Sequence, residues 1–132
     1  MSFILDSDHC IAILRKRLDI STRVSLQPPL FVTAITVSEL TFGAHKSARV
    51  AQNLAQVDVL LNGVTILPFD TDAARRHGEL KDTLRRAGTP LAELDLQIAS
   101  IALCRGLPLV THNTGHFNRI PGLILVDWLT PQ

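Results

Sequence analysis

Short apolar runs alternate with segments of helical periodicity along this chain, and this alternation constrains its fold more than any other feature. We expect the apolar runs to be buried β-strands over residues 3–5, 31–35, 64–67, 107–110 and 123–126. Strands that alternate with helices through short turns form an α/β fold with a mostly parallel sheet. With 132 residues, 46% of them hydrophobic, the chain is expected to form a single domain over residues 1–132.

The segments between the strands predict the helices and one loop. Helices are expected over residues 7–18, from about residue 36, over residues 50–61, from Asp70 or Thr71 to Gly88, and over residues 95–105. The last of these is apolar almost all round and should therefore lie at the centre of the fold. Residues 19–30 are expected to be a polar loop, and the two cysteines, Cys10 and Cys104, buried thiols.

Three acidic residues lie where an apolar run gives way to a predicted helix. Asp6 follows the first run, Glu39 follows the second, and Asp95 opens the helix over residues 95–105. The carboxyl ends of parallel strands meet at one edge of a sheet, where ligands gather. Clustered carboxylates repel one another and are costly to keep ionised unless a cation lies between them. The pattern indicates a divalent metal site and phosphate chemistry.

Each of these acids also has a structural interpretation. Asp6 can cap the helix that begins at Ser7, Glu39 can complete a capping box with Thr36, and Asp95 can be an N-cap or a first-turn acid. Their shared position at one sheet edge favours a common site over three separate caps. Two interpretations of Asp8 are possible: it can contact the metal through a water molecule, or it can support the first turn of the helix.

Other chemistries fit the sequence less well. His112 and His116 are four residues apart, but the Asn-Thr-Gly between them predicts a turn, which argues against zinc. A phosphoacceptor receiver domain requires a Lys after its fifth strand, and the last Lys here is Lys81. A haloacid-dehalogenase-type phosphatase shares the opening Asp6-Ser7-Asp8 but requires a later Gly-Asp motif that this chain lacks.

The composition of the chain indicates the kind of substrate that such a site would bind and the cellular compartment of the protein. Ten of the thirteen basic residues are Arg, whose forked guanidinium suits a nucleic-acid backbone, although the Arg clusters also fit solvated helix faces. The chain shows no basic segment followed by a long apolar core and no apolar run of membrane-spanning length. We therefore expect a cytoplasmic protein with no membrane partner.

Four ordered motifs resemble the PIN-domain nucleases of the VapC toxin type. They are Ile4-Leu5-Asp6-Ser7-Asp8, Ser38-Glu39-Leu40 with Gly43, the segment from Gly88 to Ala99, and the closing segment from Leu109 to Leu123. The resemblance implies a three-layer α/β/α fold whose five-stranded sheet has the order 3-2-1-4-5. It also implies a metal-dependent endoribonuclease that acts as the toxin of a type II toxin–antitoxin pair.

The same resemblance implies roles for particular residues and partners. Asp6 and Asp95 would be the principal ligands of Mg²⁺, or of Mn²⁺ in its place, with Glu39 completing the acidic set and Asn113 in the catalytic site. His116 stands where the family often has Glu, and Asp8 where Asn is usual. The implied partners are an RNA substrate (a tRNA or another structured RNA), a VapB-type antitoxin, DNA only through that antitoxin, and a second copy of the chain.

One interpretation from a different class is also open. The same fold can serve as a non-catalytic binding module whose metal site is degraded, and His116 and Asp8 are the features that favour it. The two helical segments at residues 44–61 and 71–87 carry apolar stripes beside polar faces and are the expected dimer contacts.

Overall fold

A five-stranded parallel sheet forms the centre of the computed structural model, which describes residues 2–19 and 30–129. Its strand order is β3-β2-β1-β4-β5, and every neighbouring pair is parallel. The predicted sheet order is therefore confirmed. The strands are β1 (Phe3–Leu5), β2 (Leu30–Thr33), β3 (Thr65–Leu67), β4 (Leu109–Val110) and β5 (Leu125–Val126).

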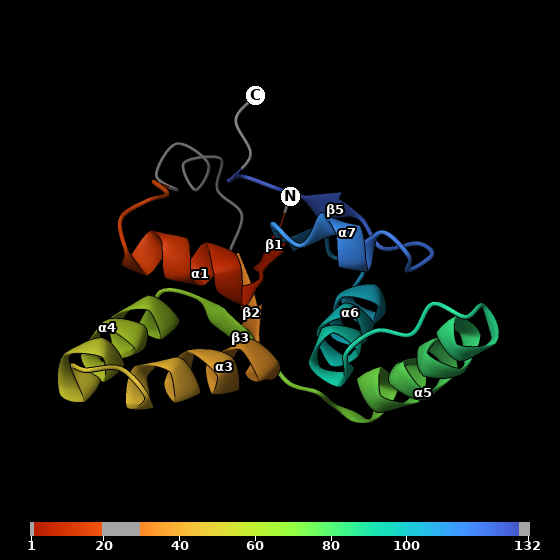
Figure 1. Ribbon diagram of the computed structural model, residues 1–132, viewed down its shortest axis with the longest axis horizontal. Coiled ribbons are helices and arrows are strands. Elements are labelled where there is room, and N and C mark those ends of the chain that lie inside the picture. Colours follow the sequence, from red (N-terminus) through yellow and green to blue (C-terminus); the bar gives the residue numbers. More distant parts are fainter. Residues whose placement is uncertain (1, 20–29, 130–132) are drawn as a thin grey trace.

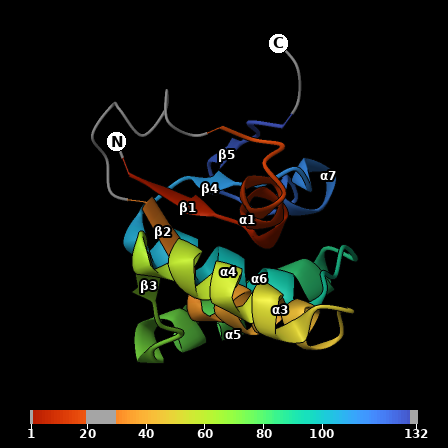
Figure 2. The same ribbon diagram turned by 90° about the vertical axis from the view of Figure 1, so that its left-hand side faces the viewer.

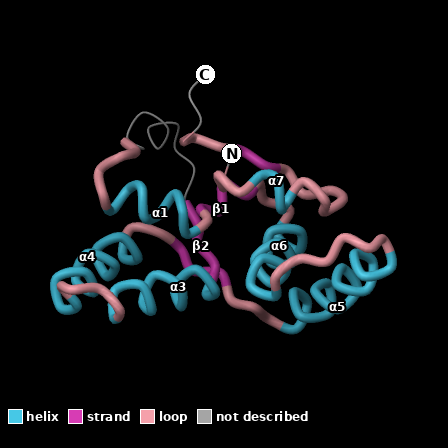
Figure 3. The backbone as a smooth tube through the Cα atoms, viewed as in Figure 1, coloured by secondary structure: helices cyan, strands magenta, loops and turns pink. Residues whose placement is uncertain are grey.

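Helices cover both faces of this sheet. Figure 1 shows one group, α1, α3 and α4, on one side of the strands and a second group, α5, α6 and α7, on the other. Figure 2 views the first group from its own side, and Figure 3 shows the short strands between the two groups. The helices are α1 (Ser7–Leu14), α3 (Ala34–His45), α4 (Val50–Asn62), α5 (Thr71–Arg86), α6 (Glu93–Arg105) and α7 (Thr114–Phe117).

Two hydrophobic clusters hold the layers together, because successive side chains of a strand point to opposite faces. Ile4 and Leu109 pack with α5 and α6, whereas Leu5 and Val110 pack with α1, α3 and α4. Helix α6 buries six residues on several of its faces, as its apolar sequence predicted. Within the described residues, no helix is long and apolar enough to cross a membrane.

Helix α1 is shorter than predicted and ends at Leu14 instead of residue 18. Its end is a Schellman-type turn, in which Arg17 N–H donates to Ala12 O at 2.7 Å and Lys16 N–H to Ile13 O at 3.0 Å. Lys16 takes the left-handed conformation there, with φ 57°. The sequence lacks the glycine that normally announces this turn, so the prediction missed it.

Other boundaries shift by a few residues. The second strand ends at Thr33, and its helix already begins at Ala34. The turn predicted at Asn113-Thr114-Gly115 is instead the start of the short helix α7 (Thr114–Phe117), which Asn113 precedes as the N-cap. Cys10 is buried as predicted, but Cys104 is exposed in the last turn of α6, so the prediction of a second buried thiol is wrong. The predicted polar loop lies, at residues 20–29, outside the described part of the chain.

Candidate active site

The parallel sheet brings the predicted acids to one edge. Asp6 directly follows β1, α3 starts at the end of β2 and carries Glu39 in its second turn, and Asn113 lies just beyond β4. Asp95 lies in the first turn of α6. The charges of Asp6 and Asp95 both raise the pKa of Glu39, so the three carboxylates act on one another electrostatically.

Asp6 is both a helix cap and the most buried carboxylate of this group. One oxygen, Oδ1, accepts a hydrogen bond from Ser7 N–H at 2.8 Å as the N-cap of α1. The other, Oδ2, accepts from the Thr111 hydroxyl at 2.8 Å. Burial, together with the nearby charge of Asp8, raises the pKa of Asp6 to about 6. The capping interpretation is therefore correct for Asp6 and does not exclude a role in the site.

Glu39 does not take part in the capping box that the sequence allowed. Thr33 is the N-cap of α3 and accepts from Thr36 N–H at 3.2 Å, so the capping box between Thr36 and Glu39 does not form. Glu39 Oε1 is buried and accepts no hydrogen bond from any described residue. Burial, followed by the charges of Asp6, Asp95 and Asp8, raises the pKa of Glu39 to about 7. An unpaired buried carboxylate oxygen is costly and needs an explanation.

Asp95 is a first-turn acid of α6, and its interpretation as an N-cap is wrong because the cap is Ala92. Burial raises the pKa of Asp95, while His116 opposes the rise. His116 Nδ1 lies 3.7 Å from Asp95 Oδ2 and 2.9 Å from the side-chain nitrogen of Asn113. Helix α7 thus places the His116 ring near Asp95 and Asn113.

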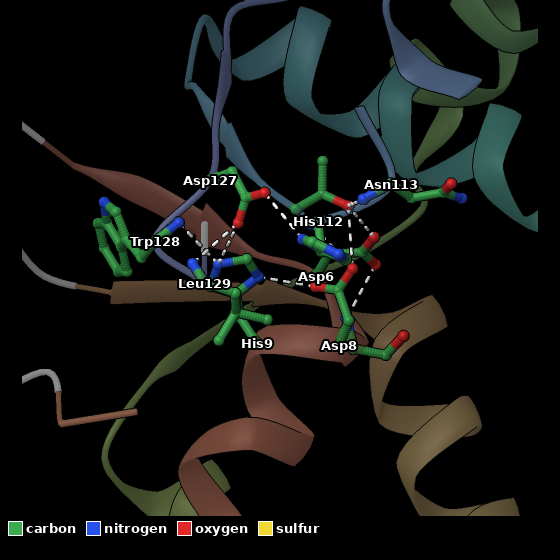
Figure 4. Close-up of polar contacts among 10 residues, drawn as sticks. Asp6, Asp8, His9, His112, Asn113, Asp127, Trp128 and Leu129 are labelled. Carbon is green, nitrogen blue, oxygen red and sulfur yellow. Dashed lines mark hydrogen bonds and ion pairs between the residues drawn. The ribbon is translucent and has the colours of Figure 1, made fainter. Parts of the chain in front are cut away.

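Asp8, like Asp6, accepts hydrogen bonds at both of its carboxylate oxygens, but its pKa is lowered, whereas the pKa values of the other three acids are raised. Burial acts to raise the pKa of Asp8, but hydrogen bonds from the ring of His9 and from His112 N–H outweigh it and lower the pKa. Figure 4 shows Asp8 within a polar network that also contains His9, His112 and Asp127. These donors already stabilise the negative charge of Asp8, whereas Glu39 Oε1 has no donor among the described residues, so direct metal ligation by Asp8 is less favoured than ligation by Glu39.

Three members of this network, namely Thr111, His9 and Asp127, were not predicted as site residues from the sequence. Asp127 directly follows the last apolar run, which is the same signal that identified Asp6. Thr111 is fully buried and His9 is also fully buried. Buried polar side chains next to a strand end are a structural signal, and the sequence alone could have indicated only Asp127.

The donor set fits a hard divalent cation. Asp6, Glu39 and Asp95 offer carboxylate oxygens and Asn113 an amide oxygen, the ligand types that Mg²⁺ and Mn²⁺ prefer. The unpartnered Glu39 Oε1 and the raised pKa values of Asp6 and Glu39 identify negative charge that lacks a counterion. Within the described part of the chain, no three His, Cys, Asp or Glu side chains are already arranged around one metal position. The acids therefore lie close together without forming a completed ligand set.

A groove of about 690 Å³ between α1, α3 and α4 opens beside these acids. Glu39 lies on its wall together with Ser7 of α1, and Arg15 and Lys46 supply positive charge. Phe42, 65% exposed, lies three residues beyond Glu39 on α3, and the Lys46 ammonium is 5.3 Å from its ring centroid. The groove thus combines an acidic end with a cationic and apolar wall.

Comparison with known proteins gives the same family at the level of sequence. Residues 3–123 match the PIN domain family. The chain is 37% identical over 130 residues to the tRNA(fMet)-specific endonuclease VapC of Salmonella typhimurium, covering 97% of this chain and 98% of that protein. It is 31% identical over 132 residues to Ribonuclease VapC2 of Rickettsia felis, covering 97% and 98%.

Solved structures agree with this result. The chain superimposes with a TM-score of 0.90 and 37% identity on DNA-bound VapBC from Salmonella typhimurium, covering 97% of this chain and 98% of that one. It superimposes with a TM-score of 0.89 and 30% identity on VapBC2 from Rickettsia felis bound to a promoter DNA fragment, covering 97% and 99%.

Proposed function

The chain belongs to the PIN-domain family, among its VapC ribonucleases, and from this premise we propose that Asp6, Glu39 and Asp95 hold a Mg²⁺ ion for cleavage of RNA. Mn²⁺ can substitute, because all the donors are oxygens. The single observation that carries the proposal is the buried Glu39 Oε1, which accepts no hydrogen bond from a described residue although neighbouring acids surround it. A cation is the group that would satisfy it.

Each side chain of the site has a separate role in phosphodiester hydrolysis. A divalent cation at this position supplies Lewis-acid polarisation of the phosphodiester and of the attacking water. Asp6, held by Ser7 N–H and the Thr111 hydroxyl, provides a fixed negative anchor. Asp95, or Glu39 through its second carboxylate oxygen, would orient the attacking water. Asn113 would hydrogen-bond a ligand of the cation or the RNA.

The chain acts as the toxin of a type II pair, as an endoribonuclease that inhibits translation and growth. Its substrate is RNA, and the name of the Salmonella relative supports a tRNA as the target. The groove with Arg15 and Lys46 is suited to the RNA backbone. Its site of action is the cytoplasm, where translation takes place, and residues 1–132 act as one nuclease domain.

Two protein partners complete the proposal. A VapB-type antitoxin is the cognate partner, as the names of the VapBC complexes suggest, and any DNA contact is made through that antitoxin. The chain also pairs with a second copy of itself through helical faces that include α4, on which Val59 is 74% exposed.

The non-catalytic binding module is not favoured. Asp6, Glu39 and Asp95, the acids that cleavage would require, are all present and influence one another electrostatically, which supports the nuclease. His116 and Asp8, which suggested a degraded site, lie around these acids without replacing any of them.

The test compares growth and RNA ends after brief induction of the parent protein, Asp95→Asn and the control Asp70→Asn. Asp70 caps α5 by accepting from Ala73 N–H at 2.9 Å, and Asn caps a helix about as well as Asp, so the control should change stability by less than about 1 kcal/mol. The parent and Asp70→Asn should arrest growth and produce defined RNA 5′ ends, whereas Asp95→Asn should do neither. Full toxicity of a well-folded Asp95→Asn protein would refute the site.

A further inference from the structure

A buried histidine lies behind the acidic site, and no hydrogen bond or ion pair in the described structure joins it to any of the three proposed metal ligands. His9 is fully buried in α1. Its Nδ1 lies 2.7 Å from Asp8 Oδ1, and its Nε2 lies 3.0 Å from Trp128 N–H. The mechanism above does not use this side chain, yet a buried imidazole with both nitrogens engaged has a defined orientation.

The two partners determine which ring nitrogen of His9 donates a hydrogen bond and which accepts one. A backbone N–H can only donate, so Nε2 of His9 accepts the bond from Trp128 and carries no hydrogen. An ionised carboxylate can only accept, so Nδ1 carries the hydrogen and donates it to Asp8. Asp127 Oδ1 is 3.6 Å from Nε2, beyond hydrogen-bond distance. His9 therefore donates from Nδ1 to Asp8 and accepts at Nε2 from Trp128.

Asp8 connects the His9 ring to the loop after β4 through hydrogen bonds. Its Oδ1 accepts from His9, and its Oδ2 accepts from His112 N–H at 2.9 Å, with the Thr111 hydroxyl 3.3 Å away. Half-buried and held from both sides, Asp8 has no freedom to rotate. It fixes the backbone of the segment that carries Thr111 and Asn113.

Thr111 connects this segment to the first metal ligand. Its hydroxyl donates to Asp6 Oδ2 at 2.8 Å and accepts from Asn113 N–H at 3.0 Å. A single hydroxyl hydrogen can orient only one strong acceptor, and the shorter distance assigns it to Asp6. The contacts therefore run from His9 through Asp8 to the backbone of His112, and from the neighbouring Thr111 to Asp6. Figure 4 shows His9, Asp8, His112 and Asp6 in this network.

We propose that His9 is a positioning residue of the cation site, which acts by fixing Asp8 so that Thr111 holds Asp6 in place for metal binding. The inference rests on the proposed function, because it assumes the cation site there. Partners behind a metal ligand orient it, and their loss typically weakens metal affinity by about 10–100-fold.

The stereochemistry of Asn and Gln separates the two contacts of His9. The Asn amide nitrogen is as many bonds from the backbone as Nδ1, so His9→Asn keeps a donor toward Asp8 and loses the acceptor for Trp128. The Gln amide reaches the position of Nε2, so His9→Gln keeps an acceptor for Trp128 and loses the donor toward Asp8. Both variants introduce a side-chain amide, so comparing His9→Asn with His9→Gln tests the contact to Asp8 without a difference in polarity.

The measurement is Mn²⁺ titration by calorimetry of the full chain, with folding checked by the fluorescence of Trp128, the sole tryptophan. His9→Gln should weaken Mn²⁺ binding about tenfold, whereas His9→Asn should bind close to the parent value. In an Asp8→Ala background, His9→Gln should cause no further loss, because the residue through which it acts is gone. Equal losses in the two His9 variants, or the same loss with and without Asp8, would overturn the inference.

A second variant covers the case in which the buried substitution prevents folding. Asp8 is 32% exposed in its side chain, so Asp8→Ala is expected to fold, and alone it should weaken Mn²⁺ binding. Unchanged affinity in Asp8→Ala would overturn the inference whatever the His9 variants do. Absence of Mn²⁺ binding by the parent protein would instead refute the proposed cation site itself, and the two failures are distinguishable.

Discussion

Substitution of Glu39 by Gln should stabilise the protein in the absence of metal, although it removes a site residue. Burial and the neighbouring acids raise the pKa of Glu39 from the usual 4.5 to about 7. A carboxyl with a raised pKa binds its proton more tightly in the folded state than in the unfolded state. The contribution of the Glu39 carboxyl to the free energy of unfolding is therefore most favourable below pH 4.5. It declines as the pH rises to about 7 and is constant above that value.

The expected change in the free energy of unfolding follows from the size of the rise in the Glu39 pKa. At about 1.4 kcal/mol per pH unit, a rise of this size corresponds to roughly 3 kcal/mol. The Glu39 side chain is partly open to solvent, and screening reduces the expected effect to about 1–2 kcal/mol. Glutamine keeps the shape without the charge, so at pH 8 in EDTA the variant should melt about 5 °C higher than the parent.

The assay is thermal unfolding of both proteins in EDTA at pH 5 and pH 8, with Glu79→Gln as the matched control. Glu79 is 73% exposed on α5 and faces Arg76 at 3.9 Å, so its replacement should change the melting temperature little at either pH. The advantage of Glu39→Gln should be largest at pH 8 and small at pH 5. With Mg²⁺ at about 100 times its dissociation constant, only the parent should gain roughly 2.7 kcal/mol. A Glu39→Gln protein that is less stable than the parent at pH 8 in EDTA would refute this account of the site.

Three further outcomes are expected. RNA cleavage should require Mg²⁺ or Mn²⁺ and stop in EDTA, because every proposed ligand is an oxygen donor; undiminished cleavage in chelator by metal-free protein would contradict this. Replacing His116 by Glu should tighten Mg²⁺ binding in calorimetry, more at pH 6 than at pH 8, because it places a carboxylate beside Asp95, where the His116 ring now lies 3.7 Å away; equal affinities would place His116 outside the site. Light scattering at micromolar concentration should give the mass of two chains, and a monomer there would count against pairing through α4.

The sequence by itself determined the architecture, because strand and helix periodicity are local properties. Apolar runs with helical segments between them predicted a parallel α/β sheet, and family resemblance predicted its order, which the structure has. The same reasoning identified Asp6, Glu39 and Asp95, since each lies just after a strand or in the first turns of a helix. Local signals failed where their usual residue was missing, as at Lys16, which ends α1 without a glycine.

Only the tertiary structure decided what each polar side chain does. Thr33, and not Thr36, caps α3, which leaves Glu39 without a hydrogen bond to its buried oxygen from the described residues. Asp8 is bonded to His112 across 104 positions of sequence, and Thr111 reaches Asp6 across 105. Such contacts depend on which strand ends meet in three dimensions, and no local pattern records them. The roles of acids that look alike in the sequence were therefore separated by burial and by the donors that the fold brings to each.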